Sequence, residues 1–322
     1  MSSYAELHCL SNFTFLRGAS HPAELVHQAY ALGYRALALT DECSISGVVR
    51  AHVAARELGL QFIIGSEFTL NNGDKFVLLV TNKNGYRQLT RLITLARRRA
   101  PKGEYHLTVD DLRAKSLSDC LSLVVCDPSP TPIERKHAKF QAISDHAKRL
   151  KSLMPNRVWL TLEQPGYGTD ECHQKNLEAL SENLQIPIVA TGNVHMHCRA
   201  RQPLQDTLTA IRHQKSILNI KHCLAANAER HLRSKKFLKH LYRKTALNHS
   251  IQIAEQCHFS LDELHYQYPS ELIPDGLSAT QYLRQLVELG ATRRWPDGPI
   301  EKVLNQIEHE LSLIAELNYE GY

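Results

Sequence analysis

YAELHCLS at residues 4–11 and ALALTDE at residues 36–42 are two short apolar runs, and each ends in side chains that can bind a metal ion. Between them, residues 22–32 carry apolar side chains at helical spacing and stop at Gly33. A strand, a helix and a second strand with polar groups at the strand ends is how an α/β barrel presents an active site. The two runs therefore predict such a barrel, with a metallohydrolase site that lacks part of its ligands.

Strand and helix signals alternate over the first two thirds of the chain. Strands are predicted at residues 5–10, 36–39, 61–64, 76–80, 121–125, 158–162 and 186–190, and helices at 22–32, 47–58, 86–97, 133–153 and 170–184. This regular alternation favours a parallel α/β sheet. The carboxyl ends of such strands converge on one face, and the polar residues at or just beyond them are His8, Asp41, Glu67, Cys126, Glu163 and His195.

The composition is that of a globular protein, with 322 residues of which 43% are hydrophobic and 22% charged. No apolar run approaches the roughly 20 residues that span a bilayer, and the N-terminus has no basic segment followed by an apolar core. We therefore expect a cytoplasmic protein without a membrane partner. The 8 cysteines include no CxxC pair, which argues against a structural zinc knuckle.

A basic stretch at residues 199–244 follows the alternating region, and only Asp206 and Glu229 oppose its positive charge. Such a stretch is typical of a surface that faces a polyanion, and equally of a solvated helix face. From about residue 220 the strand signals fade, and helices are predicted within residues 232–257, 279–289 and 301–317. The candidate DNA-binding residues are Lys235, Lys236, Lys239, Arg243 and Lys244.

Separated blocks of the sequence carry a family resemblance. They read ELHCLSNFTFLRGAS at 6–20, LTDEC at 39–43, IGSEF at 64–68, NGYRQL at 84–89, ATGNVH at 190–195, IEHEL at 307–311 and NYEGY at 318–322. In this order they resemble the N-terminal region of bacterial C-family DNA polymerases, the DNA polymerase III alpha-subunit-like proteins. The residues in these blocks are similar to those of the error-prone branch of that family, which acts in damage-induced mutagenesis.

The resemblance implies a polymerase-and-histidinol-phosphatase (PHP) domain over residues 1–225, with the fold of a distorted (β/α)7 barrel. It also implies a mostly helical connector and the truncated start of the polymerase core over residues 226–322. In complete members of the family, His, Asp, Glu and Cys side chains at the strand ends hold up to three metal ions. Clustered metals activate a bridging water for attack on a phosphoester.

This sequence departs from that ligand pattern at several positions. His8 matches the first histidine of the family's His-x-His pair, but Leu10 occupies the second. Asp41 is kept, whereas Glu42 replaces the histidine that follows it. Lys75 stands where a further histidine is expected, and an ammonium group there would repel a metal ion.

Other positions of the pattern are mixed. Glu67 matches a bridging glutamate and Cys126 matches a ligand cysteine. In the late Asp-x-His block His195 remains, but Asn193 replaces the aspartate. Arg17 stands where a ligand or an acidic residue is usual. The lost anionic charge argues against a complete three-metal hydrolase.

Two interpretations of the site stay open. In the first, a residual site binds Zn or Mn through some of His8, Asp41, Glu42, Glu67, Cys126 and His195. In the second, which the missing ligands favour, the domain is structural, and Arg17 and Lys75 pair with Glu67 or Asp41, since paired charges can neutralise clustered carboxylates without a metal.

For function, the resemblance implies the N-terminal fragment of an error-prone DNA-directed DNA polymerase, a Mg-dependent nucleotidyltransferase acting in DNA replication past damage, translesion synthesis and DNA repair. The catalytic aspartates of the palm lie beyond the position that matches Tyr322, so we expect the fragment alone to be inactive and the chain to continue. Expected partners are DNA, the proteins of a mutagenesis complex and a sliding clamp. The alternative is a stand-alone metal-dependent PHP phosphoesterase or nuclease.

Overall fold

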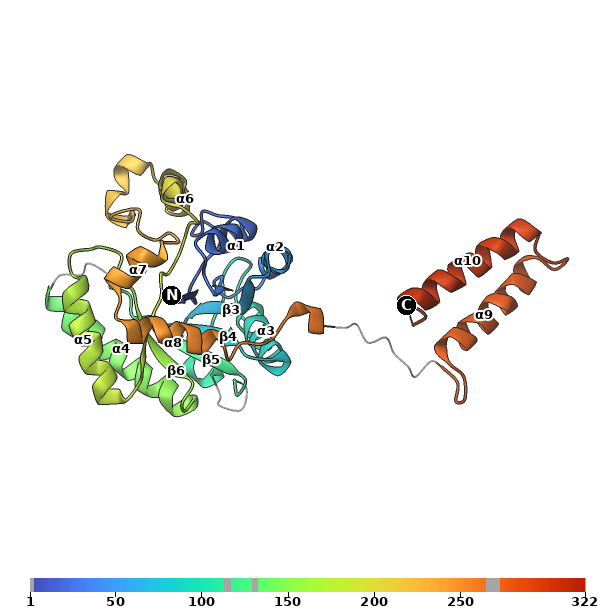
Figure 1. Ribbon diagram of the computed structural model, residues 1–322, viewed down its shortest axis with the longest axis horizontal. Coiled ribbons are helices and arrows are strands. Elements are labelled where there is room, and N and C mark those ends of the chain that lie inside the picture. The colour runs from blue at the N-terminus through green and yellow to red at the C-terminus, as the bar shows by residue number, and fades with distance from the viewer. Residues whose placement is uncertain (1–2, 113–116, 129–132, 265–272, 322) are drawn as a thin grey trace. The chain divides into compact units, whose positions relative to one another are not determined.

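The computed structural model of the protein describes residues 3–112, 117–128, 133–264 and 273–321. The chain forms two compact units, Met1–Glu263 and Leu264–Tyr322. The first contains a curled sheet with helices around it (Figure 1). Its seven strands lie in chain order: β1 Ala5–Glu6, β2 Ala36–Leu39, β3 Gln61–Thr69, β4 Lys75–Val80, β5 Cys120–Val124, β6 Val158–Leu162 and β7 Ile188–Ala190. The predicted α/β class with a seven-stranded curled sheet is confirmed.

Helices connect most of the strands and follow the last one. Between the strands lie α1 Pro22–Ala31, α2 Val48–Leu58, α3 Lys83–Arg98, α4 Ile133–Leu153 and α5 Asp170–Leu184. After β7 come α6 Gln202–Arg212, α7 Lys235–Leu241 and α8 Lys244–Ala254. Single 3₁₀ turns lie at Val109–Asp111, Arg199–Arg201, Ile217–Asn219, Lys221–Cys223 and Leu261–Glu263.

The expectation of an all-parallel sheet is wrong at β4, which pairs antiparallel with both β3 and β5, while the remaining neighbours pair parallel. β3 is longer than predicted, so Glu67 lies inside the strand. Residues 70–74 alone connect β3 to β4, far fewer than the dozen or so that a parallel crossover needs. Gly73, with a φ of 88°, and a 2.8 Å hydrogen bond from the Leu70 amide to the Asp74 carbonyl shape this turn.

The first and last strands are joined just beyond their ends. Strand β1 is shorter than predicted, and after it Cys9 forms a parallel bridge with Val194, which follows β7. The Leu10 amide donates to the Val194 carbonyl at 2.8 Å, and the Val194 amide donates to the His8 carbonyl at 2.9 Å. These contacts close the curled sheet into a barrel at the carboxyl ends of β1 and β7.

Apolar side chains cover both faces of the sheet. The outer face, with Phe68 and Phe76, packs beneath the surrounding helices. The inner face, with Leu7 and Ile63, packs against Ile253 and its neighbours in α8. The interior is therefore filled with apolar side chains at the level of α8, and the buried polar groups gather at the carboxyl ends of the strands.

The second unit is a helical hairpin of α9 Ala279–Arg294 and α10 Glu301–Leu317. Ser278 caps α9 by accepting a hydrogen bond from the Gln281 amide at 3.2 Å, and Arg284 joins the two helices through an ion pair with Glu308 at 2.6 Å. The predicted 279–289 helix is thus longer, and α10 has its predicted bounds. Packing separates the two compact units after Glu263. The expected boundary between the PHP domain and the helical connector after residue 225 stays a prediction.

Among the helices that the structure describes, none has both the length and the apolar run that a bilayer crossing requires.

Candidate functional site

The loop of residues 11–20 carries Arg17 to the carboxyl ends of the strands. The Gln205 side chain of α6 holds this loop by donating to the Arg17 carbonyl at 2.8 Å. At Gly18 the backbone crosses so closely that a Cβ atom would lie 1.9 Å from the Ser11 carbonyl oxygen. Only glycine permits this crossing, so the position of Arg17 depends on its neighbour.

Arg17 lies between two carboxylates. Its Nη1 contacts Oε2 of Glu42 and lies 2.7 Å from Oε1 of Glu67. Burial alone would lower the pKa of Arg17, but the charges of Glu67 and Glu42 raise it, so the guanidinium stays charged. Burial likewise would raise the pKa of Glu67, yet Arg17 and His8 hold it well below its usual range. Tyr105 completes the surroundings of Glu42 by donating to Oε1 at 2.9 Å.

His8 joins Glu67 to a third carboxylate. Its Nε2 lies 2.8 Å from Oε2 of Glu67, and its Nδ1 lies 3.6 Å from Oε1 of Glu163, an ion-pair distance that is longer than a hydrogen bond. Burial alone would lower the pKa of His8, but the two carboxylates raise it to about 9. The imidazole is therefore a buried cation at neutral pH.

Glu163 is held on its other side by Arg230. Nη1 of Arg230 lies 3.3 Å from Oε2 of Glu163, and Nη2 lies 3.4 Å from Oδ1 of Asp127. Asn193 also donates to Oε2 of Glu163, at 3.1 Å. Despite burial, the contacts with His8 and Arg230 lower the pKa of Glu163 to about 2. We refer to these linked side chains as the charge cluster: Glu42, Arg17, Glu67, His8, Glu163 and Arg230.

Asp41 stands beside the charge cluster and anchors the 11–20 loop. Its carboxylate accepts hydrogen bonds from the Ser11 amide at 2.8 Å, from the Ser11 hydroxyl at 2.7 Å and from the Thr14 hydroxyl at 2.7 Å. Burial raises the pKa of Asp41 in spite of these hydrogen bonds. The side chain thus fixes the loop that positions Arg17, and the expected pairing of Arg17 involves Glu67 rather than Asp41.

His195 lies at the edge of the charge cluster, whereas Cys126 packs in the apolar cluster on the outer face of the sheet. Nε2 of His195 is 3.0 Å from Oδ1 of Asn193, which links it to Glu163. Burial and the charges of Arg230 and Arg17 keep the pKa of His195 well below its usual range, so this imidazole is neutral. Cys126 is buried after β5, and its amide donates to the Thr161 hydroxyl at 3.0 Å.

The charge cluster does not suit a metal ion. Its three carboxylates, on Glu42, Glu67 and Glu163, already contact the three cations Arg17, His8 and Arg230. A divalent ion would add positive charge next to three cations that already hold these carboxylates. Within the described ranges, no three His, Cys, Asp or Glu side chains are placed to hold a metal ion. The residues present therefore do not fit the metal centre that the resemblance implies.

Sequence reasoning found part of the charge cluster. Glu163 was visible as a residue that follows a strand, but it was not in the candidate ligand set. Arg230 belongs to the basic stretch, and nothing in its local sequence distinguishes it from the surface arginines around it. Of the other predicted residues, Lys75 adds to the lowering of the pKa of Glu67 through its charge, while the direct ion pair is made by Arg17.

The basic stretch divides between buried and exposed positions. Lys235 donates to the Gly33 carbonyl at 2.7 Å, and Arg243 pairs with Glu178 at 3.1 Å. Arg233 is buried and donates to the Gln164 carbonyl at 2.9 Å. The remaining predicted DNA-binding side chains are exposed: Lys236, Lys239 and Lys244.

Comparison with known proteins gives the relationship of the chain. The family model described as the PHP domain matches residues 6–164. An error-prone DNA polymerase of Methylococcus capsulatus is 49% identical over 319 residues, covering 99% of this chain and 29% of that protein. One from Dechloromonas aromatica is 48% identical over 326 residues, covering 100% of this chain and 31% of that protein.

Solved structures show a weaker similarity. An amidohydrolase of Chromobacterium violaceum matches 60% of this chain and 88% of its own with a TM-score of 0.41 and 15% identity, a similarity too weak to bear on function. The sequence relatives are the stronger finding, and the chain spans about 30% of their length. The chain therefore carries a PHP domain and is related along its whole length to the error-prone DNA polymerases, of which it matches a part.

Proposed function

We propose that this chain is the PHP-containing part of an error-prone DNA polymerase, and that its barrel supports the polymerase without performing metal-dependent hydrolysis. DNA synthesis past damage, with the Mg²⁺ that two-metal nucleotidyl transfer uses, would belong to the remainder of the longer protein. The relatives, which are 48–49% identical over the whole chain, support the polymerase assignment.

One observation carries the structural role of the barrel. Arg17 inserts its guanidinium between the carboxylates of Glu42 and Glu67, two positions that the family resemblance matches to metal ligands. Hydrolysis of a phosphoester by clustered metals needs an open coordination position for water. A guanidinium offers five N–H donors and no lone pair, so it can neutralise the carboxylates but cannot activate water in this way.

The alternative of a PHP phosphoesterase or nuclease would need a residual Zn or Mn site among His8, Asp41, Glu42, Glu67, Cys126 and His195. His8 lies between the carboxylates of Glu67 and Glu163, and both Asp41 oxygens accept hydrogen bonds from the 11–20 loop. Cleavage of a phosphomonoester or of single-stranded DNA by the purified chain with added Mn²⁺, abolished in His8→Ala, would favour this alternative.

For partners, we propose DNA, the proteins of a mutagenesis complex and a sliding clamp, with the longer protein acting in the cytoplasm. The predicted contribution of the basic stretch to DNA binding rests on Lys236, Lys239 and Lys244, which are exposed. Lys235 and Arg243 contribute less, because each already binds a group of the barrel unit.

A chimeric polymerase tests the proposed function. In it, this chain replaces the matching segment of the Methylococcus capsulatus polymerase, which is 49% identical. We expect the chimera to extend a primed template in Mg²⁺, and a Gly18→Asp chimera to lose this activity with the loop that holds Arg17. A chimera that folds and binds primed DNA but does not extend it would contradict the proposal.

A further inference from the structure

Helix α3 carries an unusual excess of positive charge. Its sequence, KNGYRQLTRLITLARR, contains five basic residues and no acidic one. At 3.6 residues per turn, Arg87, Arg91 and Arg98 lie within about 40° of one another around the helix axis, and span about 16 Å along it. All three side chains are exposed, whereas Leu89, Leu92 and Ala96 on the opposite side are buried. We call Arg87, Arg91 and Arg98 the arginine stripe.

The other basic side chains around α3 have partners in the fold. Arg97 stacks over Tyr105 and donates to the carbonyls of Cys43 and Glu42 at 3.1 and 3.2 Å. Arg99, just after the helix, pairs with Asp111 at 2.8 Å. In contrast, no ion pair or hydrogen bond holds the side chains of the arginine stripe within the described part of the chain.

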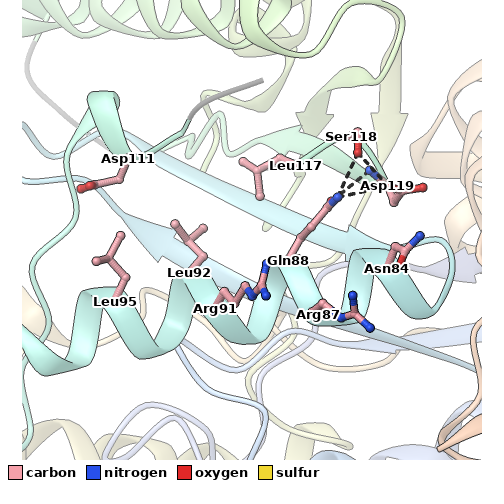
Figure 2. A pocket seen from close by; sticks show the side chains of 10 residues that line it. All are labelled: Asn84, Arg87, Gln88, Arg91, Leu92, Leu95, Asp111, Leu117, Ser118 and Asp119. Atoms are coloured by element: carbon pink, nitrogen blue, oxygen red, sulfur yellow. Dashed lines mark hydrogen bonds between the residues drawn. The ribbon is translucent and has the colours of Figure 1, made fainter. Parts of the chain in front are cut away.

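A groove of about 400 Å³ runs beside the stripe (Figure 2). Arg87 and Arg91 line it from α3 together with the Asn84 amide and the apolar side chains of Leu92 and Leu95. The facing wall consists of Asp111, Leu117, Ser118 and Asp119.

The two acids in this wall already have partners. Asp111 is paired with Arg99, and Asp119 accepts hydrogen bonds from Asn82 at 2.8 Å and from Gln88 at 3.1 Å. Neither makes an ion pair with the arginine stripe in the described structure. Asp111 is neutralised by Arg99, whereas the neutral donors around Asp119 leave its charge in place; neither acid holds Arg87 or Arg91, whose guanidinium groups stay available to a ligand.

We propose that the arginine stripe and this groove bind the phosphodiester backbone of a DNA strand. Arginine binds phosphate through paired N–H donors, and the Asn84 amide can add another hydrogen bond. Leu95, which is 37% exposed, offers an apolar contact to the sugars that accompany the phosphates, whereas Leu92 is buried beneath the groove. The stripe extends beyond the groove to Arg98, which fits a continuous polyanion better than a single small anion.

The choice of DNA rests on the proposed function, because an acidic protein would offer a similar field of negative charge. The test is fluorescence anisotropy of labelled single-stranded and duplex oligonucleotides with the complete 322-residue chain over a range of NaCl concentrations. The variant is Arg87→Gln with Arg91→Gln, which removes two charges from the exposed face and leaves the buried face of α3 intact. The matched control is Arg35→Gln with Lys175→Gln, two exposed positions away from α3, of which Arg35 precedes β2 and Lys175 pairs with Glu171 on α5.

We expect the α3 variant to bind about tenfold more weakly at low salt, with the slope of log K against log salt reduced by about 1.4 for a single strand and about 1.8 for a duplex. The control should bind as the wild type does, and both variants should keep the wild-type unfolding temperature. The single-strand and duplex arms show which form of DNA supplies the phosphates.

Any of the following results would overturn the inference: no DNA binding by the wild-type chain, equal affinities and salt slopes for the wild type and the α3 variant, or an equal loss in the control. Competition by polyglutamate as effective as that by DNA of equal charge would also overturn it, by assigning the surface to an acidic protein. None of these results decides the proposed function, because primer extension by the chimera tests that function in a separate measurement.

Discussion

At the scale of single residues, Arg17 determines whether the buried carboxylates are balanced. Its side chain is 12% exposed, and its guanidinium contacts both Glu42 and Glu67. Removing one partner of a buried ion pair is far more costly than removing both, because the remaining charges stay buried without compensation. Arg17 is therefore the position at which the structural and the metal-binding interpretations give opposite expectations.

We predict that Arg17→Ala lowers the free energy of unfolding by roughly 3–5 kcal/mol. We also predict that Mn²⁺ or Zn²⁺ restores part of the loss, because the carboxylates of Glu42 and Glu67 would then face a vacated position that a cation can fill. The wild type should contain no stoichiometric metal and should gain no stability from either ion. Urea unfolding with and without metal, together with elemental analysis, measures both effects.

The matched control is Arg35→Ala, an exposed arginine whose loss should change stability by no more than about 0.5 kcal/mol. Stoichiometric metal in the purified wild type, or stabilisation of the wild type by Mn²⁺, would contradict the structural role of Arg17. Equal stability of wild type and Arg17→Ala would do the same.

The sequence predicted the departures from the metal site better than it predicted what replaces the metal. Leu10 and Glu42 stand close to His8 and Asp41, which match ligand positions of the family, so the loss of ligands could be predicted from the sequence. The contact of Arg230 with Glu163 could not be predicted, because the two residues are 67 positions apart and only the tertiary fold brings them together. The role of Asp41 in holding the 11–20 loop was hidden for the same reason, since its donors come from a separate segment.

At the scale of elements, the strands and helices with strong periodicity were predicted well. α4, α5 and α10 and strands β2 and β6 have the predicted bounds. The direction of β4 was missed because β3 was expected to end at Ile64. The connection to β4 was then long enough for either a parallel or an antiparallel pairing. Once β3 continues to Thr69, the short turn permits only an antiparallel neighbour.

The contact between α4 and the β3–β4 turn gives a prediction about pH. His146 of α4 is buried beside the Phe76 ring, with Nδ1 3.3 Å from Oδ2 of Asp74. Burial lowers the pKa of His146 to about 4, and Arg149 acts in the same direction while Asp74 opposes it. In the unfolded chain a histidine has a pKa of about 6.5.

Between pH 6.5 and pH 4 the unfolded state therefore binds a proton that folded His146 does not, so stability falls as the pH falls through this window. The loss from this residue is at most roughly 3 kcal/mol between pH 7 and pH 4. We predict that the difference in unfolding free energy between wild type and His146→Gln narrows as pH falls. Urea unfolding at several pH values measures it, with exposed His27→Gln as the control, and a constant difference would contradict the prediction.

At the scale of the whole molecule, the two units differ in how much core they contain. Nearly all buried hydrophobic side chains of the described residues lie in Met1–Glu263, and Leu311 is the exception. In the helical hairpin, Leu289, Leu304 and Leu317 are 57%, 48% and 49% exposed. The barrel unit therefore has the core needed to fold on its own, whereas the hairpin has little.

We predict that a fragment of residues 1–263 unfolds within about 2 °C of the complete chain, because it keeps every layer of the barrel core. A fragment of residues 1–243, which lacks α8, should be strongly destabilised, since Ile253 and Ala254 would no longer fill the barrel interior. Thermal unfolding followed by circular dichroism compares the three. A 1–263 fragment that is unfolded, or a 1–243 fragment as stable as the complete chain, would contradict this assignment of the core.

The charge cluster has a consequence for the cell as well as for the fold. A barrel whose buried acids are neutralised by its own arginines and histidine acquires nothing from outside the chain while it folds. On the proposed structural role, we expect its assembly not to compete for the zinc and manganese that metalloenzymes share. Starvation for these ions, which would leave a metal-filled relative incomplete, should therefore not reduce the yield of this protein.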